Sequence, residues 1–369
     1  MAHDAIVVGL GAVGSATAWQ LARRGMRVLG IDRHAPPHAH GSHCGESRIT
    51  RRAIGEGDAY VPLALRSCEI WREIESASGE PLLHEVGGLW ISSARRQSEI
   101  HVADFFERTL ATARRFGIAH EVLDAEAIRR RFPQFMVRDD ESGYYEPGAG
   151  FLRPEACVRT QLALAERAGA DLHVDEQVLD IEQDARGVTV VTARGRHRAA
   201  CAVVTAGAGV VDLVPAWRGR FDVTRQVQYW FECDGHDELP VWIWELQERA
   251  HAIYGFPSNE GVVKIATESF ARKIAPEEMY ASLVAPHLSG VAPRCVKTVR
   301  CLYTATADFR FLIDRHPSLD RVIVASACSG HGFKHSAAIG EALARWVGEG
   351  AAPEVLLPFR ASKSGPASE

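Results

Sequence analysis

The sequence has little cysteine for a disulfide framework, and its cysteine spacing does not suit a metal. Its eight cysteines are scattered through 369 residues, and no two of them form a CxxC pair. Closely spaced cysteines are the usual signature of structural zinc sites and of small disulfide-rich domains. We therefore expect reduced thiols and no bound metal.

Long apolar runs and an excess of charge are also lacking. No run approaches the roughly 20 apolar residues of a membrane span, and MAHDAIVVGLGAVG reaches its apolar stretch without a basic leader. Lys and Arg total 42 against 47 Asp and Glu, so the net charge of −5 gives no general attraction to nucleic acid or to an anionic membrane. We expect a cytoplasmic protein that binds neither. With 46% hydrophobic residues the chain can bury a large core, which favours two domains.

The N-terminal region has the clearest local organisation. Residues 5–8 form a short β-type apolar run, GLGAVG occupies 9–14, and residues 15–24 have helical composition. A second apolar run over 27–31 ends at Asp32. This order predicts a βαβ unit that carries a G-x-G-x-x-G loop.

The glycines of this loop have distinct expected roles. Gly9 permits the tight turn, Gly11 lets the backbone approach a pyrophosphate, and Gly14 lets the helix pack closely on the strand. The helix N-terminus supplies N–H donors and a positive dipole, and Asp32 can accept from ribose hydroxyls. A chance glycine turn is the alternative, and the complete strand, helix and acid context disfavours it. The motif fixes an ADP moiety without choosing between NAD and FAD.

Later segments favour a flavin. Residues 154–168 read as a helix, 171–174 and 188–191 as strands, and 201–209 as an apolar strand that runs into small residues. A strand over 322–325 leads into CSGHGFKHSAAIGEALARWV, a second glycine-rich loop with a helix behind it. Two glycine-rich helix starts in one chain suit a flavin better than a nicotinamide.

Four segments together resemble one enzyme family. APPHAHGSHCGESRITRRAIGEGDAYVPLALRS, YGFP, CLYT and SGHGFKHS are similar to the monomeric sarcosine oxidase and N-methyltryptophan oxidase family, and the similarity spans essentially the whole chain. The resemblance implies an α/β flavoprotein with a D-amino-acid-oxidase-like fold. A Rossmann-like FAD-binding domain would comprise residues 1–82, 151–220 and 304–369, and an inserted antiparallel-sheet substrate domain would comprise 83–150 and 221–303.

Short strands in the two expected inserts agree with this implication. Residues 84–91 and 223–233 show the alternation of apolar and polar residues that is typical of a sheet with one solvated face.

The resemblance also implies roles for a basic cluster, HGSHCGESRITRR. Arg51 would bind a substrate carboxylate together with Lys334, since arginine stays protonated and binds carboxylates through a planar fork. Arg48 would lie beside the flavin ring. Lys264 would lie over the flavin and promote its reaction with O2. From the pattern alone, a solvated basic loop and a solvent-facing strand lysine are the alternatives.

Cys301 matches the cysteine that the family links covalently to FAD through an 8α-S-cysteinyl bond, although a free cysteine is by default a small buried hydrophobe. Tyr254 and Tyr303 match tyrosines of the substrate pocket, with two core tyrosines as the alternative. His331 is equally compatible with a structural role. The expected catalytic set is therefore Lys264, Arg48, Arg51, Lys334, Tyr254 and Tyr303. The expected FAD-binding set is Gly9, Gly11, Ala12, Val13, Gly14, Asp32, Arg33, His34, Gly41, Ser42, Arg48, Val178, Gly207, Cys301, Gly330, His331, Gly332, Phe333 and Lys334.

Departures from the family pattern concern the substrate. Cys44 and Glu268 stand where the family has histidines, and Ile54 replaces an aromatic residue. With Trp242 and Trp244, Ile54 predicts an apolar pocket for a substrate bulkier than N-methylglycine. Tryptophans that pack outward into the core are the alternative.

The expected protein is a monomeric FAD-dependent oxidase of secondary (N-methyl or cyclic) amino acids. It would transfer a hydride from the carbon next to nitrogen to the flavin, reduce O2 to H2O2 and release an imine that hydrolyses. The alternatives are a flavin-dependent oxidase or dehydrogenase of another amine or of a primary amino acid, a nicotinamide-dependent dehydrogenase, and a catalytically silent FAD-binding protein.

Overall fold

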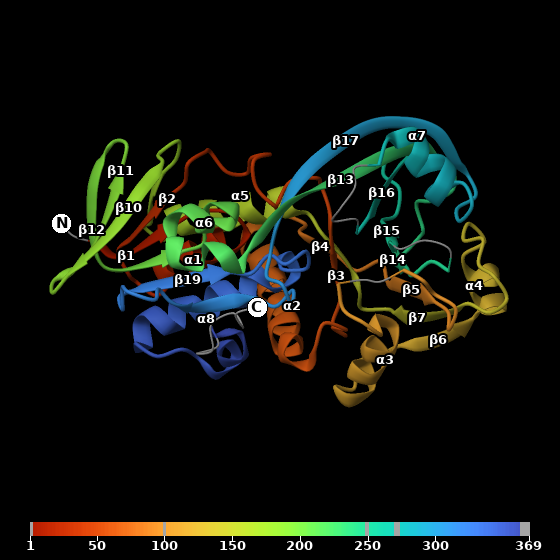
Figure 1. Ribbon diagram of the computed structural model, residues 1–369, viewed down its shortest axis with the longest axis horizontal. Coiled ribbons are helices and arrows are strands. Elements are labelled where there is room, and N and C mark those ends of the chain that lie inside the picture. Colours follow the sequence, from red (N-terminus) through yellow and green to blue (C-terminus); the bar gives the residue numbers. More distant parts are fainter. Residues whose placement is uncertain (1–2, 99–100, 248–250, 269–273, 362–369) are drawn as a thin grey trace.

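A computed structural model of the chain describes residues 3–98, 101–247, 251–268 and 274–361. One sheet is built around the N-terminal strand, and a second lies at the other end of the molecule (Figure 1). The mixed α/β class predicted from the sequence is confirmed. No helix within the described ranges is long and apolar enough to cross a membrane.

The first sheet has a parallel centre. β1 pairs in parallel with β2 and β12, β2 with β9, and β12 with β19, whereas β10, β11 and β12 form an antiparallel meander. Its strands are β1 (His3–Val8), β2 (Val28–Ile31), β9 (Asp171–His173), β10 (Val178–Asp184), β11 (Gly187–Thr192), β12 (Gly195–Val204), β18 (Leu312–Arg315) and β19 (Val322–Ser326). The predicted βαβ unit is confirmed, as are the strands expected near 171–174, 188–191 and 322–325.

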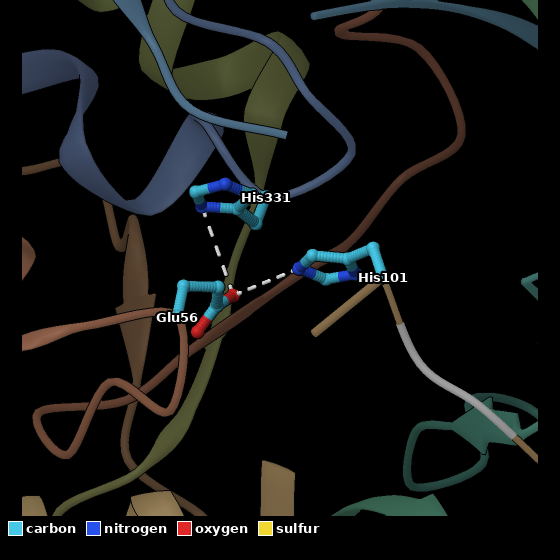
Figure 2. Close-up of side chains that lie close together, drawn as sticks. All are labelled: Glu56, His101 and His331. Carbon is cyan, nitrogen blue, oxygen red and sulfur yellow. Dashed lines mark ion pairs between the residues drawn. The ribbon is translucent and has the colours of Figure 1, made fainter. Parts of the chain in front are cut away.

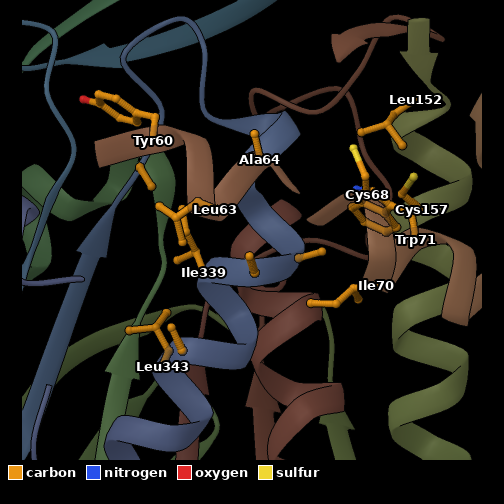
Figure 3. Close-up of a cluster of buried hydrophobic side chains, with 14 of the residues drawn as sticks. Tyr60, Leu63, Ala64, Cys68, Ile70, Trp71, Leu152, Cys157, Ile339 and Leu343 are labelled. Carbon is orange, nitrogen blue, oxygen red and sulfur yellow. The ribbon is translucent and has the colours of Figure 1, made fainter. Parts of the chain in front are cut away.

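Helices cover one face of this sheet. They are α1 (Ala12–Ala22), α2 (Val61–Ser78), α5 (Pro154–Arg167) and α8 (Ser336–Glu349). Figure 3 shows side chains from α2, α5 and α8 meeting in one apolar cluster that contains Leu63, Cys157 and Ile339. Along β1 the side chains alternate between the two faces, so that Val7 joins this cluster and Ile6 joins a second one under β10, β11 and α6 (Val210–Leu213).

The second sheet is mainly antiparallel and has the order β17-β13-β16-β15-β14-β5-β7-β6. Its strands are β5 (Gly88–Ser92), β6 (Glu121–Asp124), β7 (Ser142–Glu146), β13 (Asp222–Cys233), β14 (Val241–Trp244), β15 (Ile253–Gly255), β16 (Val262–Thr267) and β17 (Val291–Ala305). α3 (Phe105–Arg115), α4 (Ala125–Arg131) and α7 (Pro276–Met279) lie in this half of the molecule, and the long strands β13 and β17 arch toward the first half (Figure 1). The domain boundaries given above remain a prediction.

One predicted strand is wrong. Residues 84–91 form two elements. β4 (Leu83–His84) pairs with β8 (Gly150–Leu152), which also pairs with β3 (Arg48–Thr50) in a small separate sheet, whereas β5 belongs to the second sheet. Gly87 between them has a φ of +80°, a conformation that side chains disfavour. β5 is buried on both faces, so the predicted solvated face is absent there.

Close packing of α8 on α1 gives a test of the fold. A Cβ atom at Gly340 would lie 2.4 Å from Ala16 Cβ, whereas one at Gly348 in the same helix would have no atom within 4 Å. We expect Gly340→Ala to lower the free energy of unfolding by about 1–3 kcal/mol through overpacking. Gly348→Ala should be neutral or stabilising by up to about 1 kcal/mol. Urea unfolding followed by far-UV circular dichroism measures both, and equal effects would contradict the packing described.

Candidate active site

A continuous cavity of about 510 Å³ runs between the glycine loop of β1–α1 and the face of the second sheet. It is lined by every residue of the two predicted sets except Gly14 and Cys301. The structure thus brings residues from positions 9 to 334 to one place.

The glycine loop has a geometry that excludes side chains. Gly9 has a φ of +89°, and a Cβ atom there would lie 2.7 Å from the Cα atom of Ala206. A Cβ atom on Gly14 would lie 1.8 Å from the carbonyl oxygen of Gly9, so Gly14 serves packing behind the cavity wall. The first turn of α1 has no side-chain cap, and Gly11 and Ala12 face the cavity. Uncapped N–H groups at a helix start bind anions, and these residues fit a pyrophosphate.

Asp32 is held at the end of β2 with both carboxylate oxygens engaged. Oδ2 accepts from the backbone N–H of Leu10 at 2.7 Å, and Oδ1 accepts from that of His34 at 2.9 Å. Although burial opposes ionisation, hydrogen bonds from His38 and from these N–H groups hold the pKa of Asp32 below its usual value. An ionised acceptor therefore lies where the predicted ribose contact needs it.

Lys264 is buried, which excludes the alternative of a solvent-facing strand lysine. Its Nζ donates to the carbonyl oxygens of Gly45 and Ser47 at 2.6 and 2.8 Å, and it lies 4.4 Å from the ring centre of Phe256. Burial, reinforced by the charge of Arg48, holds the pKa of Lys264 well below its usual value. An anion formed beside it would favour its charged form.

Arg48 is held by backbone carbonyls rather than by a carboxylate. Its guanidinium donates to the carbonyl oxygens of Ser47 at 2.7 Å and Ser42 at 2.8 Å, and also to that of Cys44. The contacts recorded for this guanidinium thus fix its position and contribute no negative charge.

Arg51 and Lys334 converge on one carboxylate, that of Glu56. Both oxygens of Glu56 accept from Arg51 Nη2 at 2.7 Å, and Lys334 Nζ lies 3.9 Å from Oε1. Figure 2 shows His101 and His331 approaching the same oxygen, at 3.5 and 3.7 Å. Arg51 is only 3% exposed, which excludes the alternative of a solvated loop at this residue. Its Nε has no partner among the described residues.

The two stacked histidines differ in charge. Against the effect of burial, Glu268 and Glu56 raise the pKa of His101 to about 9, whereas burial lowers that of His331 to about 3. Their rings lie 5.2 Å apart and nearly parallel, and Glu268 Oε2 lies 3.1 Å from His101 Nδ1. His101 is therefore the cationic member of the stack at neutral pH.

The sheet face toward the cavity carries Ile243, Tyr254, Lys264 and Tyr303. Both predicted pocket tyrosines thus line the cavity, which disfavours two core tyrosines. Cys301 lies two residues before Tyr303 on β17, so both side chains point to the same face of the sheet. The sulfur of Cys301 lies 3.4 Å from the Nε2 atom of Gln228, which lines the cavity.

The apolar pocket predicted from Trp242, Trp244 and Ile54 is wrong. All three side chains are fully buried in apolar clusters and none lines the cavity. Side chains alternate along β14, so Ile243 faces the cavity while both tryptophans face the core under α4. A pocket for a bulky apolar group finds no support in these residues.

Sequence reasoning missed Glu56, His101 and Gln228. Glu56 had a local signal, because it follows Arg51 in the same short segment, and a buried arginine requires a partner. His101 and Gln228 had none, since only the fold brings them to the cavity.

A glycine loop at an uncapped helix start, a buried aspartate at the end of β2 and several buried basic side chains are the features expected of a dinucleotide-binding oxidoreductase. Residues 4–346 match the sequence profile of the FAD dependent oxidoreductase (DAO) family. The chain belongs to this family. This membership excludes the nicotinamide-dependent alternative. Together with the relatives described next, it identifies the protein as an FAD-dependent amine oxidase.

Relatives agree along nearly the full length. The chain is 38% identical to monomeric sarcosine oxidase of Streptomyces avermitilis, over 93% of this chain and 92% of that one. It is 33% identical to N-methyl-L-tryptophan oxidase of Escherichia coli, over 98% of this chain and all of the other. Among solved structures it is similar to NikD, described as an unusual amino acid oxidase essential for nikkomycin biosynthesis, with a TM-score of 0.84, 27% identity and 97% of both chains covered.

Titration of Lys334 gives a test of the site. Burial lowers its pKa to about 7, with Glu56 opposing the shift, so the ammonium is present below pH 7 and is lost above it. We expect the Kd of a simple carboxylate such as propionate to rise about tenfold per pH unit above 7 and to level off below pH 6. Calorimetric titration across pH 5.5–9 measures this, and Lys334→Met should flatten the profile. A wild-type affinity that stays constant over this range would show that Lys334 does not contact the anion.

Proposed function

We propose that this protein oxidises secondary amino acids, N-methyl or cyclic, with O2 as the electron acceptor. The amine loses two electrons and two protons to become an imine, O2 becomes H2O2, and the imine is hydrolysed by water. The observation that carries this proposal is the convergence of Arg51 and Lys334 on one carboxylate inside the cavity. Glu56 stands there for the carboxylate of a substrate.

The relatives support the substrate class. One is named for sarcosine and another for N-methyl-L-tryptophan, both N-methyl amino acids. Bound FAD would supply the two-electron chemistry by accepting a hydride equivalent from the carbon next to nitrogen. The glycine loop, Asp32 and the loop around Gly330 would hold it, and Arg48 would lie beside its ring system.

The residues of the chain would position the amino acid and keep its amine neutral. Arg51 and Lys334 bind its carboxylate, and Tyr254, Tyr303 and Ile243 bound the rest of the pocket. A neutral amine is needed because an ammonium has no lone pair to assist loss of hydride. Fixed positive charge nearby lowers the pKa of a bound ammonium and so favours proton release.

A substrate panel tests the carboxylate requirement. We expect kcat/KM for an N-methyl amino acid to exceed that for its decarboxylated amine by about 100-fold, because a buried charge pair is lost with the carboxylate. In Arg51→Met this ratio should fall to near unity. Peroxide release measures the rates. Equal turnover of both compounds by the wild type would exclude binding of the carboxylate by Arg51 and Lys334. Activity only on primary amino acids would favour an oxidase of that substrate class, and activity only with electron acceptors other than O2 would favour a dehydrogenase.

Lys264 would serve the reaction with O2. Electron transfer to O2 builds superoxide-like charge, and a buried ammonium stabilises developing negative charge. We expect Lys264→Met to lower kcat/KM for O2 by about 100-fold and to change anaerobic reduction by the amine much less. Stopped-flow measurement separates the two half-reactions. Equal losses in both would give Lys264 a structural role.

We further propose covalent attachment of FAD through Cys301, on the strength of the resemblance and of its place beside Gln228. Acid precipitation of the wild type should leave the yellow colour in the pellet, and Cys301→Ser should release it to the supernatant. Cys328, a partly exposed thiol that lines the cavity, offers the matched control. Release from Cys328→Ser instead, or from the wild type, would refute the assignment.

A monomeric state, a cytoplasmic location and the lack of nucleic-acid or membrane partners stay predictions from the sequence. The partner proposed from the site is a small amine together with O2.

A further inference from the structure

Two histidines and a buried glutamate meet outside the cavity. His173 ends β9, His197 lies on β12, and Glu176 follows β9 in the loop that leads to β10. His173 Nδ1 lies 3.1 Å from Glu176 Oε2, and His197 Nε2 lies 2.7 Å from Oε1. The glutamate side chain is 2% exposed, and the two histidines are 34% and 21% exposed.

This arrangement has the donor set and almost the spacing of a zinc site. Two histidines with one carboxylate, and an open fourth position, form a common zinc ligand set. Zinc lies about 2.0–2.1 Å from each ligand, so tetrahedral ligand atoms lie about 3.3 Å apart. The ligand atoms here all lie within 4.8 Å of one another, so small side-chain shifts would suffice.

The outer contacts also suit a metal. Asp171 Oδ2 lies 3.3 Å from His173 Nε2, the nitrogen that would not bind the ion. A carboxylate in that position fixes the ring orientation and the tautomer of a metal-binding histidine. Thr192 donates its hydroxyl to Glu176 Oε1 and restricts that carboxylate in turn.

We propose that His173, Glu176 and His197 bind a divalent transition-metal ion of the zinc type, with water in the fourth position. The absence of closely spaced cysteines does not bear on a site of this composition. The ligands are nitrogen and oxygen atoms from two stretches of the chain, residues 173–176 and β12, which the folded sheet brings together.

A second histidine and glutamate cluster lies in the cavity, and its electrostatics oppose a cation. Glu56 approaches His101 and His331 there, but both of its oxygens already accept from Arg51, and Lys334 lies 3.9 Å away. The ion pairs recorded for Glu176 are with His173 and His197. A divalent ion is therefore favoured at Glu176 and disfavoured at Glu56.

The proposed site is joined by backbone hydrogen bonds to Asp32, the acid expected to bind a ribose in the cavity. The backbone N–H of Asp32 donates to the carbonyl oxygen of His173, and the backbone N–H of Glu176 donates to that of Asp32, both at 2.9 Å. Gln177 and Val178 directly follow Glu176 and line the cavity. A bound ion would thus fix His173 and Glu176, the two residues that form backbone hydrogen bonds with Asp32, and so serve a structural role.

Calorimetric titration of zinc into the full-length, FAD-containing protein tests the proposal. The protein carries no histidine tag and is first dialysed against a chelator. We expect one equivalent of zinc to bind with a Kd below about 10 μM, and the thermal midpoint to rise by several degrees. His197→Asn should weaken binding by about 100-fold, and Asp171→Asn by about tenfold as an outer-shell change.

His331→Asn serves as the matched control, because it removes a histidine from the cavity cluster alone. It should bind zinc as the wild type does. No binding to the wild type, or binding that His331→Asn abolishes and His197→Asn preserves, would overturn the assignment. Because His197 is partly exposed, its substitution should leave a folded, yellow protein, which a thermal scan without zinc verifies.

Discussion

Positive charge that is kept out of water is the constraint on which this site depends. Arg48, Arg51, Lys264 and Lys334 all contact the cavity, and each must find a partner, since an unpaired buried charge costs several kcal/mol. Backbone carbonyls satisfy Arg48 and Lys264, while Arg51 and Lys334 share Glu56. The two pairs of basic residues therefore differ in the kind of partner they have. Carbonyl oxygens carry no net charge, so the contacts recorded for Arg48 and Lys264 add no negative charge, whereas Arg51 and Lys334 are already matched to a carboxylate.

The two sheets make this arrangement possible by different means. The parallel sheet supplies a helix start and Asp32 at the carboxyl ends of its strands, where ligands bind in α/β folds. The antiparallel sheet presents a side chain from each of several neighbouring strands on one face, so that Tyr254, Lys264 and Tyr303 meet although β17 lies far from β15 along the chain. Its opposite face packs Trp242 and Trp244 into a core that holds this wall rigid.

The fold could be predicted wherever its signals are local. The glycine loop, its flanking strands and Asp32 lie within one short stretch, and the geometry of Gly9 and Gly14 leaves room for no other residue. Sequence reasoning failed where the direction in which a side chain points depends on strand register. An isolated strand does not reveal which of its two faces is covered, so the sequence could not decide whether the tryptophans of β14 line the pocket or pack into the core. The structure places them in the core and Ile243 in the pocket. The positions of His101 and Gln228 at the cavity likewise depend on contacts that the fold alone creates.

The proposed chemistry requires that Arg51 and Lys334 bind the carboxylate of the substrate. A crystal structure with a non-reactive carboxylate analogue of an N-methyl amino acid, such as methylthioacetate, tests it directly. We expect a carboxylate bound in a fork by Arg51, with Lys334 within hydrogen-bond distance and Glu56 moved off the guanidinium. An analogue bound elsewhere in the cavity, with the pair of Arg51 and Glu56 intact, would contradict it.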